Sequence, residues 1–104
     1  MRVMLVASIP VEAGNAGIES GALQKVLSAL VSDLKAEAAY FLSLDGQRTA
    51  LIFCDLADTS QIPTLTEPFF MLLNADVEIY PVMNAEDLGK GLPRALEAVK
   101  KYAS

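Results

Sequence analysis

The stretch Ala38–Leu56 constrains the fold more than any other part of the chain. It consists of two apolar segments with strand-forming residues, joined at Asp45-Gly46. An Asp-Gly pair between extended runs supplies the positive φ values that a two-residue hairpin turn requires, and it is the strongest short-range hairpin signal in a sequence. The stretch therefore predicts two antiparallel strands joined by a tight turn.

Both faces of this predicted hairpin are apolar. With a two-residue loop, pairing places Tyr40, Leu42, Leu44, Thr49, Leu51 and Phe53 on one face. The other face then holds Ala39, Phe41, Ala50, Ile52 and Cys54. An antiparallel sheet with one side in water would alternate apolar with polar residues. The second face therefore needs a cover other than water.

The N-terminal third predicts a strand, a loop and a helix. Arg2–Ile9 is continuous and apolar, which indicates a first strand covered on both faces rather than a targeting segment, and Pro10 ends it. Three glycines, Gly14, Gly17 and Gly21, then predict a crossover loop. An amphipathic helix follows from Leu23, because apolar residues recur at helical spacing. These residues are Leu23, Val26, Leu27, Leu30, Val31 and Leu34.

The C-terminal half predicts a helix, a strand and a further helix. Asp58-Thr59-Ser60 can cap a short turn, and Thr64 with Glu67 offers a second capping box before a helix over Pro68–Leu73 that ends near Asn74. Val77–Met83 is the predicted fourth strand. Asn84 begins another helical segment, and the sequence predicts an interruption at Gly89, Gly91 and Pro93. An apolar stripe follows it, formed by Leu92, Leu96, Val99 and Tyr102.

This order predicts one domain over residues 1–104 of the α+β class, a ferredoxin-like βαββαβ arrangement with an extra C-terminal helix. Right-handed crossovers place the helices on one face of a four-stranded antiparallel sheet. Hydrophobic residues make up 53% of the chain, and each large side chain left in water forgoes about 1.5–3 kcal/mol. We therefore expect a second copy to cover the other face, giving a homodimer through the sheet face.

The length, the element order and the two-faced strands resemble the dimeric α/β-barrel superfamily. The segment from Glu67-Pro68-Phe69-Phe70 through Ala75-Asp76-Val77-Glu78 to Pro81-Val82-Met83 is similar to small, functionally uncharacterised members of it. Enzymes with this architecture commonly use histidine, often with tryptophan, asparagine or haem. This chain contains neither histidine nor tryptophan, so no catalytic residue carries over from those enzymes.

Composition excludes several classes of function. The net charge is −5 and the eight basic residues are scattered, so we expect no nucleic-acid binding and no anionic membrane surface as a partner. A zinc site of the usual nitrogen and sulfur ligands cannot form without histidine and with Cys54 alone. We expect no cofactor. A single cysteine also fits a reducing compartment, so we expect a cytoplasmic protein.

Four residues are candidate ligand contacts, namely Tyr40, Arg48, Tyr80 and Glu67. The two tyrosines and Arg48 are polar-tipped side chains on otherwise apolar strands, where they could orient an anionic or aromatic ligand. The alternative for Arg48, one residue past the turn, is that it points into water. Glu67, Glu78 and Asp55 could supply a general base if one of them is desolvated, although capping explains Glu67 and an edge position explains Glu78.

Two further features have ordinary alternatives. The glycine segment from Gly14 to Gly21 could cradle a phosphate, but its spacing matches no nucleotide-binding motif and a flexible loop is the simpler interpretation. Cys54 is interpreted as a packed strand thiol rather than a reactive one.

Three functions stay open at this point. The first is a homodimer that binds a small apolar or weakly anionic molecule or serves as an accessory subunit. The second is a cofactor-independent oxygenase or isomerase of a small aromatic compound, with an acidic residue or Tyr40 handling the proton. The third is a structural protein-interaction module. An enclosed pocket lined by Tyr40, Arg48 or an acidic group would favour binding or catalysis.

Overall fold

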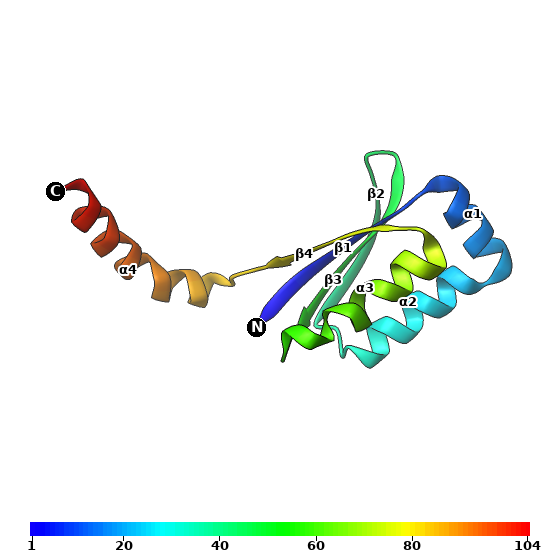
Figure 1. Ribbon diagram of the computed structural model, residues 1–104, viewed down its shortest axis with the longest axis horizontal. Helices are drawn as coiled ribbons and strands as arrows, with labels where there is room; N and C mark the ends of the chain where they lie inside the picture. Colours follow the sequence, from blue (N-terminus) through cyan, green and yellow to red (C-terminus); the bar gives the residue numbers. More distant parts are fainter.

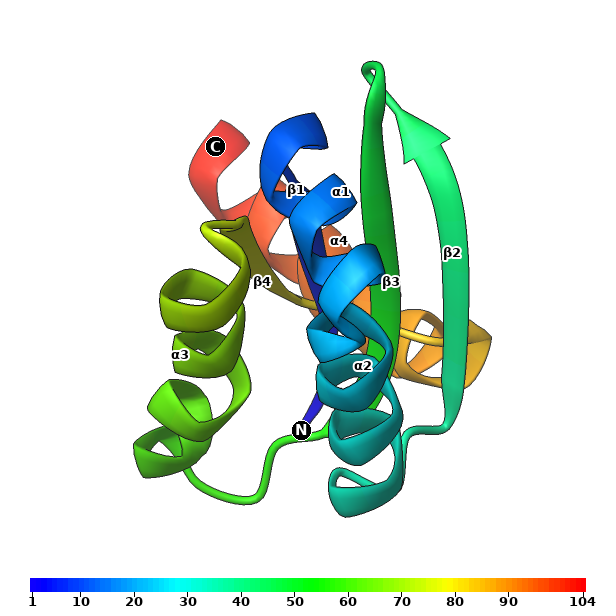
Figure 2. The same cartoon turned by 90° about the vertical axis from the view of Figure 1, so that its right-hand side faces the viewer.

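The computed structural model describes residues 1–104 as an α+β fold built on one four-stranded antiparallel sheet with the strand order β2-β3-β1-β4. This arrangement is compatible with the ferredoxin-like fold. Figures 1 and 2 show α1, α2 and α3 together on one side of the sheet. The elements are β1 (Arg2–Ile9), α1 (Val11–Ser20), α2 (Ala22–Asp33), β2 (Ala38–Leu44), β3 (Gln47–Asp55), a 3₁₀ turn η1 (Thr59–Gln61), α3 (Ile62–Leu73), β4 (Asp76–Pro81) and α4 (Ala85–Ala103).

The hairpin prediction is confirmed in its turn and its register. Asp45 and Gly46 have φ values of 53° and 77°, the two positive values that a tight hairpin turn needs. Leu44 pairs with Gln47 across the turn, so the loop has two residues. Tyr40 therefore lies opposite Leu51, and the two predicted faces of the hairpin are those of the structure.

One face of the sheet carries the core. On β1 and β3 the residues that alternate toward the helices are almost fully buried: Val3, Leu5, Ala7, Ala50, Ile52 and Cys54. Phe69, Leu65 and Leu73 of α3 and Leu23, Val26 and Leu30 of α2 complete this core. The helix stripe predicted from Leu23 is confirmed, because α2 buries three of its six members and half-buries the rest.

The other face of the sheet, here called the open face, has no cover within the chain. The strand registers place on it the larger residues Met4, Val6, Tyr40, Leu42, Leu44, Leu51, Phe53, Glu78 and Tyr80, together with Ser8, Thr49 and Asp76. Tyr40 is 61% exposed, and its ring meets the edge of Phe53 at a centroid distance of 6.4 Å. The open face is thus largely apolar, as the alternation of the strands predicted. Its residues on the outer strands β2 and β4 are exposed, and those on the inner strands β1 and β3 are half-buried, except Thr49, which is buried.

The predicted loop at Gly14, Gly17 and Gly21 is wrong, because Val11–Ser20 forms a helix. Glycine lowers helix propensity, but two of these glycines lie where a side chain would collide with a neighbour. A Cβ on Gly17 would lie 3.1 Å from Cβ of Leu23 and 3.3 Å from Leu73. Gly21, at φ 83°, is the left-handed residue that separates α1 from α2.

The second capping box predicted at Thr64 is also wrong. The cap predicted at Asp58-Thr59-Ser60 is confirmed, because Asp58 caps η1 and Ser60 N donates to its carboxylate at 2.8 Å. The next helix, α3, begins at Ile62 rather than at Pro68. The hydrogen bonds from Ser60 hold the pKa of Asp58 below its usual value. Pro63 fits because the first turn of a helix has no partner for its N–H group. The predicted end of this helix near Asn74 is confirmed.

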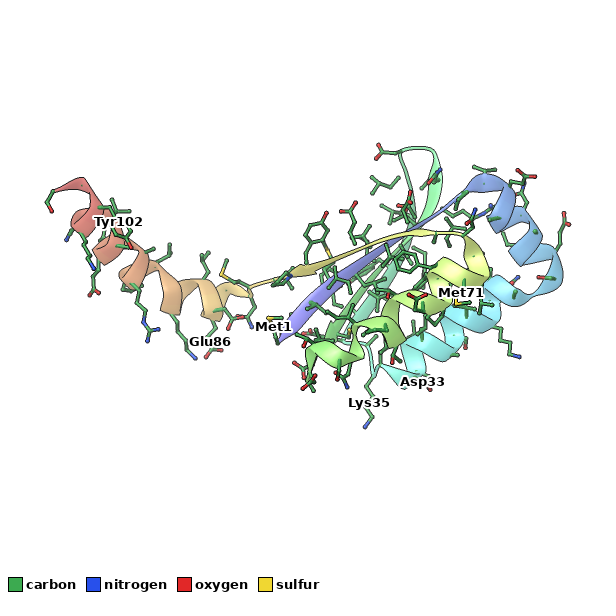
Figure 3. All side chains as sticks on the ribbon, viewed as in Figure 1. Met1, Asp33, Lys35, Met71, Glu86 and Tyr102 are labelled. Atoms are coloured by element: carbon green, nitrogen blue, oxygen red, sulfur yellow. The ribbon has the colours of Figure 1, made fainter.

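The last helix, α4, is continuous, so the predicted interruption at Gly89, Gly91 and Pro93 is wrong. The fourth strand ends at Pro81 rather than Met83. Figure 1 shows α4 beyond the end of the sheet, and Figure 3 places Tyr102 near its far end. The molecule therefore measures 60 × 28 × 22 Å, and its radius of gyration is 17.2 Å, whereas a compact domain of this length has about 13 Å.

No helix combines the length and the apolar character that a membrane span requires.

Candidate ligand-binding site

An apolar cavity of about 330 Å³ lies between α2 and the turn end of the β2–β3 hairpin, on the helix side of the sheet. We call it the Arg48 pocket. Its lining residues are Ile9, Leu23, Leu27, Phe41, Leu42, Ser43, Arg48, Thr49 and Ala50. The volume lies at the lower end of the range of small-molecule sites.

The strand register explains why Arg48 faces this cavity. Arg48 is the second residue of β3 and lies opposite Ile9 of β1 and Ser43 of β2. It alternates with Ala50 toward the helices. Arg48 thus lines a cavity between the sheet and the helices, and its role in binding stays a prediction. Leu23 and Leu27 come from one face of α2, since residues four apart stand above one another.

The Arg48 side chain is held by α1. Its Nη1 donates to the Val11 carbonyl at 3.3 Å, and its Nη2 donates to Oδ1 of Asn15 at 3.0 Å. The guanidinium lies over Gly14, where a Cβ would stand only 2.5 Å from Nη1. Gly14 therefore makes room for the arginine, and the helix that replaces the predicted loop fixes its position.

No carboxylate balances the charge of Arg48. The four ion pairs of the protein involve other residues, and the two partners of Arg48 are neutral oxygens. A guanidinium has five N–H donors, so three remain after these two bonds. A half-buried cation with free donors beside an apolar cavity favours an anionic group on the ligand.

Tyr40 lies on the opposite side of the sheet from Arg48. It lines a shallow hollow of about 360 Å³ with Arg2, Glu37, Ala38, Phe53 and Asn84. Arg2 Nε donates to Glu37 at 2.7 Å, and this hydrogen bond is the main reason that the pKa of Arg2 is raised. The carboxylate in this hollow is therefore already paired.

The remaining predicted contacts are dispersed. Tyr80 also lies on the open face, where its hydroxyl donates to the carboxylate of Glu78, and Glu67 is exposed on α3. Asp55 binds the N-terminal ammonium group at 2.8 Å. The structure thus brings neither Tyr40, Tyr80 nor Glu67 to Arg48, and their roles in binding stay predictions.

Cys54 lies in the core of the sheet, 1% exposed, opposite Val3 of β1. Burial raises the pKa of its thiol, and the charge of Asp55 raises it further. Since the thiolate is the reactive form, both effects lower its reactivity.

We therefore expect Cys54 to resist 5,5′-dithiobis(2-nitrobenzoic acid) at pH 8 in the native protein and to react within seconds to minutes in 6 M guanidinium chloride. The native rate should be at least about 100-fold lower than the unfolded rate, because reaction requires a local opening. Stopped-flow absorbance measures both rates. Equal rates would show that the β1–β3 region opens freely.

Sequence reasoning missed the residues that place Arg48. Asn15 and Gly14 belong to a segment predicted as a loop, and the carbonyl of Val11 is backbone. The backbone N–H of Gly14 donates to the Pro10 carbonyl at 2.8 Å within the helix, so the segment offers no phosphate cradle at that residue. No group of three or more Cys, Asp or Glu side chains converges as metal ligands would.

Comparison with known proteins gives no relative: no family model matches the chain, and no curated protein and no solved structure matches it.

Proposed function

We propose that this protein is a small cytoplasmic homodimer of the ferredoxin-like, dimeric α/β-barrel type that binds a small apolar molecule with an anionic group in the Arg48 pocket. Two observations support the assembly. The strand order and the one-sided helix layer fit that architecture. The open face exposes large apolar side chains that a second copy could cover, among them Tyr40, Leu42, Leu44 and Tyr80.

The charge of Arg48 is the observation that carries the binding proposal. The guanidinium is half-buried, unpaired with any carboxylate and anchored by Asn15 and Val11, so it is fixed before a ligand arrives. Phe41, Leu23 and Leu27 give the apolar part of the site. The lining contains no carboxylate that could act as a general base, and for this reason we place binding ahead of catalysis.

A matched pair of probes tests this proposal. 2-Naphthoate is apolar and singly anionic, and 2-naphthamide has the same shape without the charge. We expect native protein to bind the naphthoate at least about tenfold more tightly, because hydrogen bonds to charged groups contribute about 1.5–3 kcal/mol. The substitution Arg48→Met should abolish this preference while leaving the affinity for the amide within about threefold. Chemical shift changes in ¹H–¹⁵N spectra report both affinities and the site.

Arg94→Met is the control, because it removes the same charge from an exposed position on α4. It should keep the preference for the anion. Equal binding of the two probes by native protein, or shift changes confined to the open face, would contradict the Arg48 pocket as the site. A dimer with an empty pocket would favour the accessory-subunit role instead.

A further inference from the structure

The apolar stripe of α4 has no partner within its own chain. Leu88, Leu92, Leu96, Val99 and Tyr102 follow one another at intervals of four, four, three and three residues. This spacing puts all five on one side of the helix. Their exposed fractions run from 45% to 80%, and α4 has no buried residue. In proteins most of the stability of an amphipathic helix comes from packing such a stripe against another surface.

Contacts at its first turn direct α4 away from its own sheet. The backbone N–H of Val82 donates to the Arg2 carbonyl at 3.2 Å, which continues the pairing of β4 with β1 past Pro81. Asn84 then caps the helix in a reciprocal box with Asp87. Nη1 of Arg2 lies 3.9 Å from Oδ2 of Asp87. These contacts fix the first turn of α4 at the end of the sheet. Figure 1 shows that the helix extends away from the sheet from that point.

Charge favours a second copy as the surface that receives α4. Residues 85–103 hold four basic and three acidic side chains, a net charge of +1. The whole chain carries −5, so the remaining residues carry −6. The open face itself presents Glu78, and Asp76 lies in the same alternation on β4. A basic helix on the acidic body of another copy is therefore attractive, whereas two bodies alone repel.

The size of α4 is sufficient for a reciprocal contact between two copies. A 19-residue helix is about 28 Å long and about 10 Å wide, while a four-stranded sheet is about 19 Å wide. A helix of this width covers about half of the open face, whichever copy supplies it. Two reciprocal helix-on-sheet contacts involve four strips of about 280 Å² each, about 1,100 Å² in total. This exceeds the area of about 1,000 Å² that a specific interface needs.

We propose that α4 is an exchanged arm, whose apolar stripe packs on the open face of a second copy while that copy returns the same contact. The inference rests on the homodimer of the proposed function and assigns one contact within it, in which the partner's α4 covers a strip of each open face about one helix wide. A two-fold dimer of this kind uses the same pair of surfaces twice.

Matched substitutions on the two sides of α4 test the role of the stripe. Leu92→Gln with Leu96→Gln places two glutamines on the stripe, and Lys90→Gln with Glu97→Gln places two on the polar side without changing the net charge. Because α4 buries nothing in its own protomer, both variants should fold, as circular dichroism would verify. Sedimentation equilibrium should show the dimer weakened at least 100-fold by the first pair and within threefold of native for the second.

Photo-crosslinking tests where the stripe docks. With Leu96→p-benzoylphenylalanine in a mixture of ¹⁴N and ¹⁵N chains refolded together, we expect mixed-isotope cross-links from α4 to Ala38–Leu44 or Gln47–Asp55. Cross-links within one chain, or only between two α4 helices, would overturn the exchange. A dimer unaffected by the stripe substitutions would overturn it while leaving the sheet-face dimer intact, and a monomeric native protein would overturn both.

Discussion

Phe69→Ala is expected to lower the free energy of unfolding by about 3–5 kcal/mol, the typical cost of removing a buried phenylalanine side chain. Phe69 is 0% exposed and is the largest fully buried side chain of the protein. It projects from α3 into the core against the sheet, so its loss leaves a cavity that the surrounding strands cannot easily close. A small domain has about 5–15 kcal/mol in total, so the variant should be close to unfolding at 37 °C. Urea denaturation followed by circular dichroism measures the loss.

Phe70→Ala is the matched control for this substitution. Phe70 is the next residue along α3, has the same side chain and is 41% exposed. The same atoms are removed from a site that water already reaches, so we expect a loss of about 1 kcal/mol or less in the protomer. Similar losses for Phe69 and Phe70 would show that α3 is rotated from its position in the structure.

The elements predicted correctly are those whose signals are local. The Asp45-Gly46 turn, the first strand and the stripe of α2 depend on residues close together in the sequence, and the structure contains all three. Alternation along the hairpin also predicted which residues lie on the open face. The sequence indicates an apolar second face because the residues on both sides of the hairpin strands are apolar.

The error over α1 arose where a tertiary contact overrides local propensity. Gly14 and Gly17 lie inside a helix because Arg48 and Leu23 occupy the space that their side chains would need. The sequence of α1 alone does not indicate that Arg48 and Leu23 will pack against it. The errors at Thr64 and Pro93 are different: each residue carries a strong local signal for a boundary, yet each lies inside a longer helix in the structure. At Pro93 no tertiary contact overrides that signal, because α4 has no buried residue.

The candidate site was only partly predictable. The hairpin register puts Arg48 on the same face of the sheet as Ala50, and Tyr40 on the other face. The sequence therefore already indicated that the side chains of Arg48 and Tyr40 cannot share a pocket. The anchoring of Arg48 by Asn15 could not be predicted while α1 was treated as a loop. The exposure of the α4 stripe was not predictable either, because an amphipathic pattern indicates a buried face without indicating what covers it.

The proposed dimer predicts that Tyr40→Asp converts the protein to a monomer at micromolar concentration. Tyr40 is 61% exposed on the open face, so the protomer does not need it for folding. A second copy would bury the side chain at position 40. An unpaired carboxylate buried in an apolar interface costs several kcal/mol of association free energy, which is enough to dissociate most dimers of this size. Each interface of a two-fold dimer would contain two such carboxylates. We therefore expect at least about a 1,000-fold weaker dimer by sedimentation or native mass spectrometry.

Phe41→Asp separates this effect from a general weakening of β2. Phe41 is the neighbouring residue on the same edge strand and is 57% exposed, but it points to the helix side and lines the Arg48 pocket. Aspartate disfavours a strand equally at both positions, so both protomers should lose similar stability. Only the substitution at Tyr40 should change the assembly, and only the one at Phe41 should weaken 2-naphthoate binding. Two monomeric variants, or two dimeric ones, would mean that the open face is not the dimer interface, and the cover for its apolar residues would have to be a different protein.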